Sequence, residues 1–246
     1  MLNIVIPMGG LGKRFAESGQ YNWPKPLIEV PLKNNKSGPM IQLVVENLNL
    51  AGKYIFIVSK EHYQKYALNY LLPLITKPYD CEIVIEEPPI YGAASACLFA
   101  KHLINNDDNL IVANSDQWID YDSEEFLKSV KNVDGSILTF YGTHPKWSFC
   151  KVDEATNLIT EVAEKKPIST NANTGIYYWN KGSDFINSVE EMIADEFKIN
   201  NEYYVAPSFN YLINKDKKIL NYPVAQMQGL GTPEDLQKFL QLKINQ

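Results

Sequence analysis

Short apolar runs alternate with amphipathic stretches through the first half of the chain. The apolar runs predict buried β-strands, and the stretches between them have the spacing of α-helices. The predicted strands are Asn3–Met8, Tyr54–Val58, Glu82–Glu86, Leu110–Asn114 and Ser136–Phe140, and the predicted helices are Met40–Ala51, His62–Leu72, Ala93–Leu103 and Glu124–Lys131. Strands that are apolar along their whole length are typical of a mainly parallel sheet covered by helices on both faces. The pattern therefore predicts an α/β fold.

The second half of the chain has a different pattern. Two runs on either side of Asn157 predict a hairpin, and a further strand and two helices follow. These elements are Phe149–Val152, Leu158–Ala163, Asn173–Trp179, Ser183–Asp195 and Tyr204–Asn214. A last helix is predicted from Thr232 to Leu242, because Thr232 suits the N-cap and Pro233 the first helical position. No repeat or linker interrupts the chain, so we expect residues 1–246 to form a single domain.

Composition and charge narrow the function classes. The 246 residues are 45% hydrophobic and carry a net charge of −6, which argues against a nucleic acid or an anionic membrane as partner. The three cysteines are far apart and form no C-x-x-C pair, so we expect reduced thiols in a cytoplasmic protein. We expect neither a signal peptide nor a membrane span, because the N-terminus lacks a cationic segment and the apolar runs are short.

A glycine-rich turn follows the first predicted strand, and cations follow the turn. Glycines let backbone N–H groups close around an anion, and Arg14 and Lys25 would add positive charge for a polyphosphate. Phe15 replaces the third glycine of a G-x-G-x-x-G motif, and no G-K-[ST] closes a P-loop. The alternative is a tight strand-to-helix turn with solvated lysines. The turn contains Met8, Gly9, Gly10, Gly12 and Lys13, and Lys25 lies between Pro24 and Pro26.

A carboxylate follows another predicted strand. Asp116 comes after the apolar run 110–113 and the pair Asn114 and Ser115. Because ligands of parallel sheets bind at the carboxyl ends of strands, Asp116 and the glycine-rich turn are expected at one edge. A carboxylate there can hold Mg²⁺ against a triphosphate. The alternative is an Asp that caps a turn before the helix near Ser123.

Three further segments carry weaker signals. Small residues such as Gly92 and Ala93 after Glu87 would let a flat base lie against the backbone, although an ordinary helix start has the same pattern. Lys165, beside Glu164, could contact a phosphate, or it could belong to a charged turn. Gly175 could admit a second substrate, or it could be an ordinary strand glycine. The isolated histidines His62, His102 and His144 receive no role.

Together these segments resemble the sugar-phosphate nucleotidylyltransferase family, the nucleoside-diphosphate-sugar pyrophosphorylases, over nearly the whole chain. The similar segments are Gly9–Arg14, Pro24–Leu27, Glu87 with Gly92–Ala96, Asn114–Asp116, Glu164–Lys165, Thr174–Tyr177 and Gly231–Leu236. The resemblance implies a Rossmann-like, mainly parallel mixed sheet flanked by helices. It also implies that the phosphate of an acceptor attacks the α-phosphorus of a nucleoside triphosphate, that pyrophosphate leaves, and that Mg²⁺ takes part.

The resemblance also implies roles for individual residues. Residues 1–142 would bind the nucleotide and residues 143–246 a phosphorylated small-molecule acceptor, and a homodimer is compatible with it. The implied catalytic residues are Arg14 and Lys25, and the implied metal ligand is Asp116. The implied nucleotide-binding residues are Met8, Gly9, Gly10, Gly12, Lys13, Glu87, Gly92, Ala93 and Ser115. The implied acceptor-binding residues are Glu164, Lys165, Asn173, Gly175 and Tyr203.

Two departures from the family pattern bear on the substrate. Gly229 stands where many members carry an Asp that serves as a second metal ligand. Glu87 stands where several relatives use Gln to pair with thymine or uracil. A carboxylate only accepts hydrogen bonds, so Glu87 favours the exocyclic amine of cytosine and therefore CTP. The amines of guanine and adenine would also satisfy it.

Segments in the second half resemble a capsule-associated branch that transfers CMP to phosphorylated glutamine. They are Thr143–Ser148, Glu164–Pro167, Asn201–Pro207 and the ending Gly229–Pro233. Three alternatives stay open. The acceptor could be a hexose or heptose 1-phosphate. A glycosyltransferase of a related fold would usually carry D-x-D, whereas Asn114 precedes Asp116 here. Gly229 would also suit a non-enzymatic module that senses nucleotides.

Overall fold

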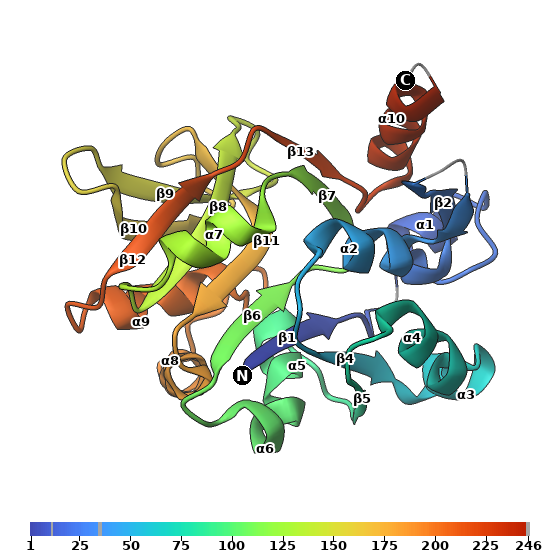
Figure 1. Ribbon diagram of the computed structural model, residues 1–246, viewed down its shortest axis with the longest axis horizontal. Helices are drawn as coiled ribbons and strands as arrows, with labels where there is room; N and C mark the ends of the chain where they lie inside the picture. The colour runs from blue at the N-terminus through green and yellow to red at the C-terminus, as the bar shows by residue number, and fades with distance from the viewer. Residues whose placement is uncertain (11, 34–35, 245–246) are drawn as a thin grey trace.

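The computed structural model describes residues 1–10, 12–33 and 36–244. In this part of the chain the central feature is a nine-stranded mixed sheet with the strand order β5-β4-β1-β6-β11-β8-β12-β10-β9 (Figure 1). The predicted α/β fold, a mixed sheet flanked by helices, is confirmed.

The parallel part of the sheet is formed by four strands from the first half. They are β1 (Leu2–Pro7), β4 (Lys53–Ser59), β5 (Cys81–Glu86) and β6 (Asn109–Ala113). Each coincides with a predicted strand to within about a residue at either end. The apolar side chains of β1, β4 and β6 are buried on both faces, which is why these runs are almost continuously hydrophobic, whereas Ile85 of the edge strand β5 is exposed.

The second half extends the sheet mostly with antiparallel pairs. Strand β11 (Asn171–Trp179) pairs antiparallel with both β6 and β8 (Gly135–Tyr141). Strand β12 (Ile219–Pro223) runs parallel to β8. The predicted hairpin is confirmed as β9 (Ser148–Asp153) and β10 (Leu158–Glu164). Asn157, just before β10, has a φ of 56°, a left-handed conformation that Asn tolerates well.

Two small sheets lie outside the central sheet, and their strands were not predicted. One pairs β7 (Gln117–Asp120) with β13 (Gln226–Gly229), and the other pairs β2 (Glu29–Pro31) with β3 (Ser37–Pro39). Strand β12 was not predicted either. The pairing of β7 with β13 brings the segment after β6 against a segment more than 100 residues later in the sequence.

Helices cover both faces of the sheet, as predicted. One face packs against α2 (Met40–Leu48), α4 (Leu68–Thr76) and α7 (Ser123–Ser129). The opposite face packs against α5 (Ala93–Cys97), α6 (Lys101–Ile104), α8 (Gly182–Ala194) and α9 (Phe209–Ile213). A third apolar cluster joins α10 (Pro233–Ile244) to α1 (Lys13–Glu17) and β2, and Figure 1 shows these segments side by side.

Several predicted helices have different bounds in the structure. The single helix predicted over 62–72 is wrong, because Ala67 adopts a left-handed φ of 50° that separates α3 (Lys60–Lys65) from α4. The helix predicted from residue 40 ends at Leu48, because Asn49 is also left-handed. A 3₁₀ turn, η3 (Leu98–Ala100), interrupts the helix predicted over 93–103.

Of the last two predicted helices, the first begins later than predicted and the second begins where it was predicted. The helix predicted from residue 204 begins only at the 3₁₀ turn η4 (Ala206–Ser208), where Pro207 occupies the first turn. The start of α10 is confirmed, because the Asp235 N–H donates to Thr232 Oγ1 at 3.1 Å. No helix in the described ranges is long and apolar enough to cross a membrane.

Candidate active site

The carboxyl ends of β1 and β6 place a lysine and a carboxylate in direct contact. Lys25 Nζ lies 2.6 Å from Asp116 Oδ2, and the two residues are 91 positions apart in the sequence. The side chains are 23% and 20% exposed, respectively. Lys25 begins the 3₁₀ turn η1 (Lys25–Leu27), and Pro24 and Pro26 restrict the backbone on both sides of it. The structure therefore brings Lys25, which follows the glycine-rich turn in the sequence, into contact with Asp116.

The described glycines of the turn differ in how much space surrounds them. Gly10 has open space where a Cβ would lie, whereas a Cβ on Gly9 would overlap the carboxylate of Glu86. Gly12 has a left-handed φ of 57°, and its Cβ position is 3.3 Å from Lys25 Cβ. Leu11 lies outside the described residues. The turn is thus open at Gly10 and packed closely against neighbouring side chains at Gly9 and Gly12.

The residues that flank the turn point in different directions. Met8 is buried in the core, and its N–H donates to Ile57 O at 2.8 Å, so only its backbone borders the turn. Lys13 and Arg14 are exposed on α1. Burial raises the pKa of Tyr204, and the charge of Arg14 opposes this shift. The charge of Arg14 therefore reaches Tyr204.

Hydrogen bonds join the segment at Gly92 to the segment at Tyr203. The Ala94 N–H donates to Tyr203 O at 3.1 Å, and the Tyr203 N–H donates to Tyr91 O at 2.6 Å. Gly92 has a φ of 98°, and a Cβ on it would lie 2.6 Å from Tyr203 O. Only glycine fits this close approach. The side chain of Tyr203 is 5% exposed and packs in the core, so it offers mainly backbone atoms to a ligand.

Tyr204, which the sequence reasoning missed, contacts the predicted Lys165. Lys165 Nζ donates to Tyr204 Oη at 2.5 Å and lies 4.6 Å from the centre of its ring. Lys165 has a left-handed φ of 55°, and its N–H donates to Trp147 O at 3.0 Å. These contacts hold the Lys165 ammonium against Tyr204, the tyrosine whose pKa is also affected by the charge of Arg14.

Buried polar groups gather around Glu164 and Asn173 in the second half of the chain. Ser148 Oγ donates to the Glu164 carboxylate, and burial raises the pKa of Glu164. Asn173 Oδ1 accepts a bond of 2.9 Å from Cys150 Sγ, while Asn173 Nδ2 is buried without a partner in the described part of the chain. Tyr177 interacts with both Glu164 and Asn173. Buried polar atoms without partners are rare, so this cluster is suited to a polar ligand.

Gly175 allows β11 to approach the end of β6. A Cβ on Gly175 would overlap the Asn114 side chain, and its φ is 87°. The Asn114 N–H donates to Gly175 O at 2.9 Å, and the register of β11 shifts between Asn173 and Tyr177. Ser115, next along the chain, is 5% exposed. The predicted Gly175 and Ser115 therefore both lie near Asp116.

Asp116 is the one predicted metal ligand, and the structure gives it few acidic neighbours. Among the described residues, no group of three or more His, Cys, Asp or Glu side chains could hold a metal ion. The Cβ position of Gly229 is 2.9 Å from the Trp147 ring, so the ring fills the space that a second carboxylate would need. Mg²⁺ is often held by one or two carboxylates together with substrate phosphates. Asp116 fits such a site only with phosphates supplying further oxygens.

Two neighbouring glutamates at the end of β5 have opposite environments. Glu87 is exposed, whereas Glu86 is 8% exposed and its carboxylate lies against Gly9. Burial raises the pKa of Glu86. Only Glu87 was predicted from the sequence. Glu86 could have been predicted as a site residue from its position at the end of the predicted strand Glu82–Glu86, because ligands bind at the carboxyl ends of parallel strands.

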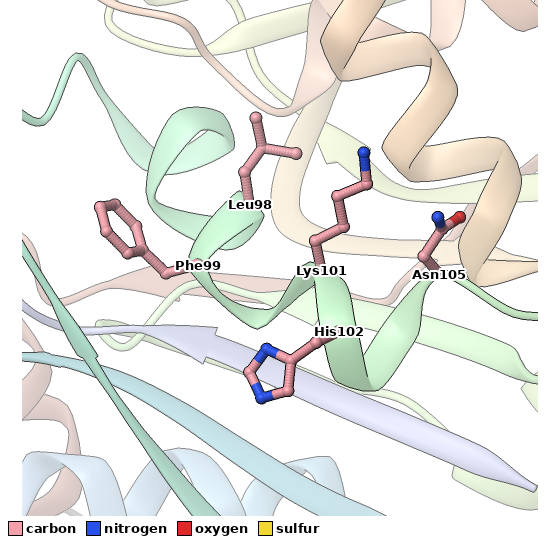
Figure 2. Close-up of a pocket in the computed structure, with 5 residues that line it drawn as sticks. All are labelled: Leu98, Phe99, Lys101, His102 and Asn105. Carbon is pink, nitrogen blue, oxygen red and sulfur yellow. The ribbon is translucent and has the colours of Figure 1, made fainter.

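A surface hollow elsewhere on the molecule carries no comparable chemistry. Figure 2 shows that its lining side chains come from η3, from α6 and from Asn105, which follows α6. One of them, Lys101, pairs with Glu190 at 2.5 Å. The predicted residues lie instead at the carboxyl ends of the strands.

Comparisons with known proteins agree with this geometry. Residues 4–229 match a family model described as nucleotidyl transferase. The chain is similar to the nucleoside-diphosphate-sugar pyrophosphorylase from Vibrio cholerae RC9, with 24% identity, 97% of this chain and 99% of that chain covered, and a TM-score of 0.77. No curated protein matches the chain.

Two further solved structures are similar. One is a UDP-glucose pyrophosphorylase complexed with UDP-glucose, with 17% identity, 100% of this chain and 99% of that chain covered, and a TM-score of 0.78. The other is HddC from Yersinia pseudotuberculosis complexed with GMP-PN, with 18% identity, 99% of this chain and 100% of that chain covered, and a TM-score of 0.68. At such low identities the solved structures establish a shared fold.

Proposed function

This chain belongs to the nucleotidyl transferase family and is a nucleotidyltransferase, and from that premise we propose that it transfers CMP from CTP to a phosphorylated small molecule. The observation that carries the proposal is the contact of 2.6 Å between Lys25 and Asp116. It places a cation and a potential metal ligand beside the glycine-rich turn. Residues 1–142 would bind the nucleotide and residues 143–246 the acceptor.

The proposed reaction needs charge neutralisation more than proton transfer. An oxygen of the acceptor phosphate forms a bond to the α-phosphorus, the bond to the bridging oxygen breaks, and pyrophosphate leaves. The acceptor phosphate is ionised near neutral pH, so no general base is required. The protein must bring two mutually repelling anions together and stabilise the charge of the transition state.

Three cations are available for this task. Lys25 would contact the phosphates at the reacting centre, and Arg14 would bind the leaving pyrophosphate. Lys165 would hold the acceptor phosphate, because Tyr204 positions its ammonium in the acceptor half. A Mg²⁺ ion held by Asp116 and the triphosphate would supply further positive charge.

We propose phosphoglutamine as the acceptor, as in CTP:phosphoglutamine cytidylyltransferases of capsular phosphoramidate synthesis. The resemblance of residues 143–148, 164–167 and 201–207 to that branch supports this acceptor. Glu164 and Asn173 also suit an amino acid, because a carboxylate accepts from an ammonium group and Asn173 Nδ2, which has no hydrogen-bond partner among the described residues, can donate to a carboxylate.

Two alternatives each have an observation in their favour. A sugar 1-phosphate acceptor is favoured by the similar pyrophosphorylase from Vibrio cholerae RC9, which is described as acting on nucleoside-diphosphate sugars. A non-enzymatic nucleotide sensor is favoured by Gly229, because Trp147 fills the place of a second acidic ligand.

Pyrophosphate release is the measurement that tests the proposal. We would combine each of the four ribonucleoside triphosphates with Mg²⁺ and with phosphoglutamine, glucose 1-phosphate or a heptose 1-phosphate. We expect release with CTP and phosphoglutamine. Release only with a sugar 1-phosphate would support the first alternative. Nucleotide binding by calorimetry without any release would support the sensor.

A further inference from the structure

The most unusual buried group near the glycine-rich turn is the carboxyl group of Glu86. Glu86 ends β5 and is 8% exposed. Its carboxylate occupies the place where a side chain of Gly9 would lie. Glu86 therefore reaches from the end of β5 across β4 to the turn that follows β1, since the strand order there is β5-β4-β1.

The backbone of Glu86 belongs to the ladder between β5 and β4, but within the described ranges its side chain forms no hydrogen bond and no ion pair. Burying a carboxyl group without a partner costs free energy, and natural proteins usually pair such a group. Burial raises the pKa of Glu86, and Glu86 in turn helps to raise the pKa of Cys97 on α5. A group kept at such a cost, in contact with a ligand-binding turn, is a candidate for ligand recognition.

The surroundings of Glu86 suit a flat, polar ligand. Gly9 presents its backbone on one side, and Cys97 belongs to the short helix that begins just after Gly92. Ala93, the first residue of that helix, is partly exposed and has a small side chain, so a planar ring could lie against it. Glu87, by contrast, is exposed one residue beyond the strand.

We propose that Glu86, and not Glu87, recognises the nucleobase, by accepting a hydrogen bond from the exocyclic amine of cytosine. This inference rests on the proposed function, because it names the residue that selects CTP at that site. It also explains why position 9 has no side chain, since any Cβ there would displace the carboxyl group.

The hydrogen-bonding groups of the base decide how well it fits Glu86. A carboxylate oxygen accepts hydrogen bonds, so it suits the N4 amine of cytosine. Uracil presents an acceptor, O4, in the same place, and two acceptors repel each other. Guanine also carries an exocyclic amine, and the comparison with GTP in the test below separates it from cytosine.

The test compares base selectivity in three single variants of the full chain. Glu86→Gln can turn its amide to donate to O4 of uracil, so we expect the ratio of kcat/KM for CTP over UTP to fall about tenfold to a hundredfold, the range for one specific base contact. Glu82→Gln is the matched control on the same strand, because Glu82 is half exposed and pairs with Lys53 at the opposite end of β4. We expect its ratio to match that of the wild type.

Three outcomes would overturn the inference. One is an unaltered ratio in Glu86→Gln, and another is a loss of selectivity in Glu87→Gln in place of Glu86→Gln. The third is a wild-type preference for GTP. Thermal melts of each variant verify folding, and Glu86→Leu provides a second variant without hydrogen-bonding atoms, expected to lose CTP affinity in calorimetry. If the wild type itself turns over no triphosphate, the proposed function fails, whereas turnover with unchanged selectivity removes only the role of Glu86.

Discussion

Replacement of Lys25 by Ala tests the central contact of the site most directly. The ammonium of Lys25 lies 2.6 Å from Asp116, and both side chains are about four-fifths buried. Loss of one preorganised charge contact typically lowers kcat by ~10²-fold or more, which equals about 2.7 kcal/mol of transition-state stabilisation. We therefore expect Lys25→Ala to lower kcat by ~10²-fold or more at saturating substrates.

The same replacement should also lower stability by a smaller amount. Exposed ion pairs contribute about 0.2–1 kcal/mol, and breaking a fully buried pair costs about 3–5 kcal/mol. A pair that is one-fifth exposed lies between these limits, so we expect a loss of about 1–2 kcal/mol in urea unfolding. Addition of Asp116→Asn should reduce kcat only slightly further, because residues that act as a unit are not additive.

Lys53→Ala is the matched control for Lys25→Ala. Lys53 is 24% exposed and pairs with Glu82 at 3.2 Å, but it lies at the amino end of β4, away from the predicted residues. Initial rates of pyrophosphate release would be measured for both variants. A kcat for Lys25→Ala as close to the wild-type value as that of Lys53→Ala would refute the role of Lys25.

Three further predictions concern the rest of the site. Gly175→Ala should destabilise the protein by about 1–3 kcal/mol in urea unfolding, because the Cβ would overlap Asn114 in a left-handed conformation; an unchanged midpoint would contradict this. Lys165→Met should raise the KM for the acceptor about tenfold or more and the KM for CTP much less, because Lys165, which donates to Tyr204, is proposed to hold the acceptor phosphate; equal effects on both KM values would count against it. Glu86→Gln should raise Tm at neutral pH, and the gain should shrink as the pH falls towards 4.5. Because burial raises the pKa of Glu86 above its usual 4.5, the stability that its protonated form provides is lost as the pH rises through the raised value. Cys97, which faces Glu86, stays neutral in this range because burial raises its pKa as well. A gain that is independent of pH between 4.5 and 8 would contradict the shift.

The sequence alone predicted the parallel strands and the glycine-rich turn, because both depend on local chemistry. Short continuous apolar runs are typical of buried strands. The left-handed conformation of Gly12 and the position of Lys25 between two prolines depend only on a few neighbouring residues. The start of α10 was predictable for the same reason, since Thr232 caps its own helix. The short strands β7 and β13 were missed, because they are only four residues long and carry no apolar run.

Only the tertiary structure decided which side chains meet. Lys25 contacts Asp116 across 91 positions, and Lys165 contacts Tyr204 across 39, and no local pattern encodes such a pair. The sequence also could not show whether Glu86 or Glu87 faces the glycine-rich turn. The apolar run 83–85 of β5 has no alternation of apolar and polar positions, so its pattern does not reveal which of the two glutamates points towards the turn. The fold resolves this, because the register and order of the strands aim Glu86 at Gly9 and leave Glu87 exposed.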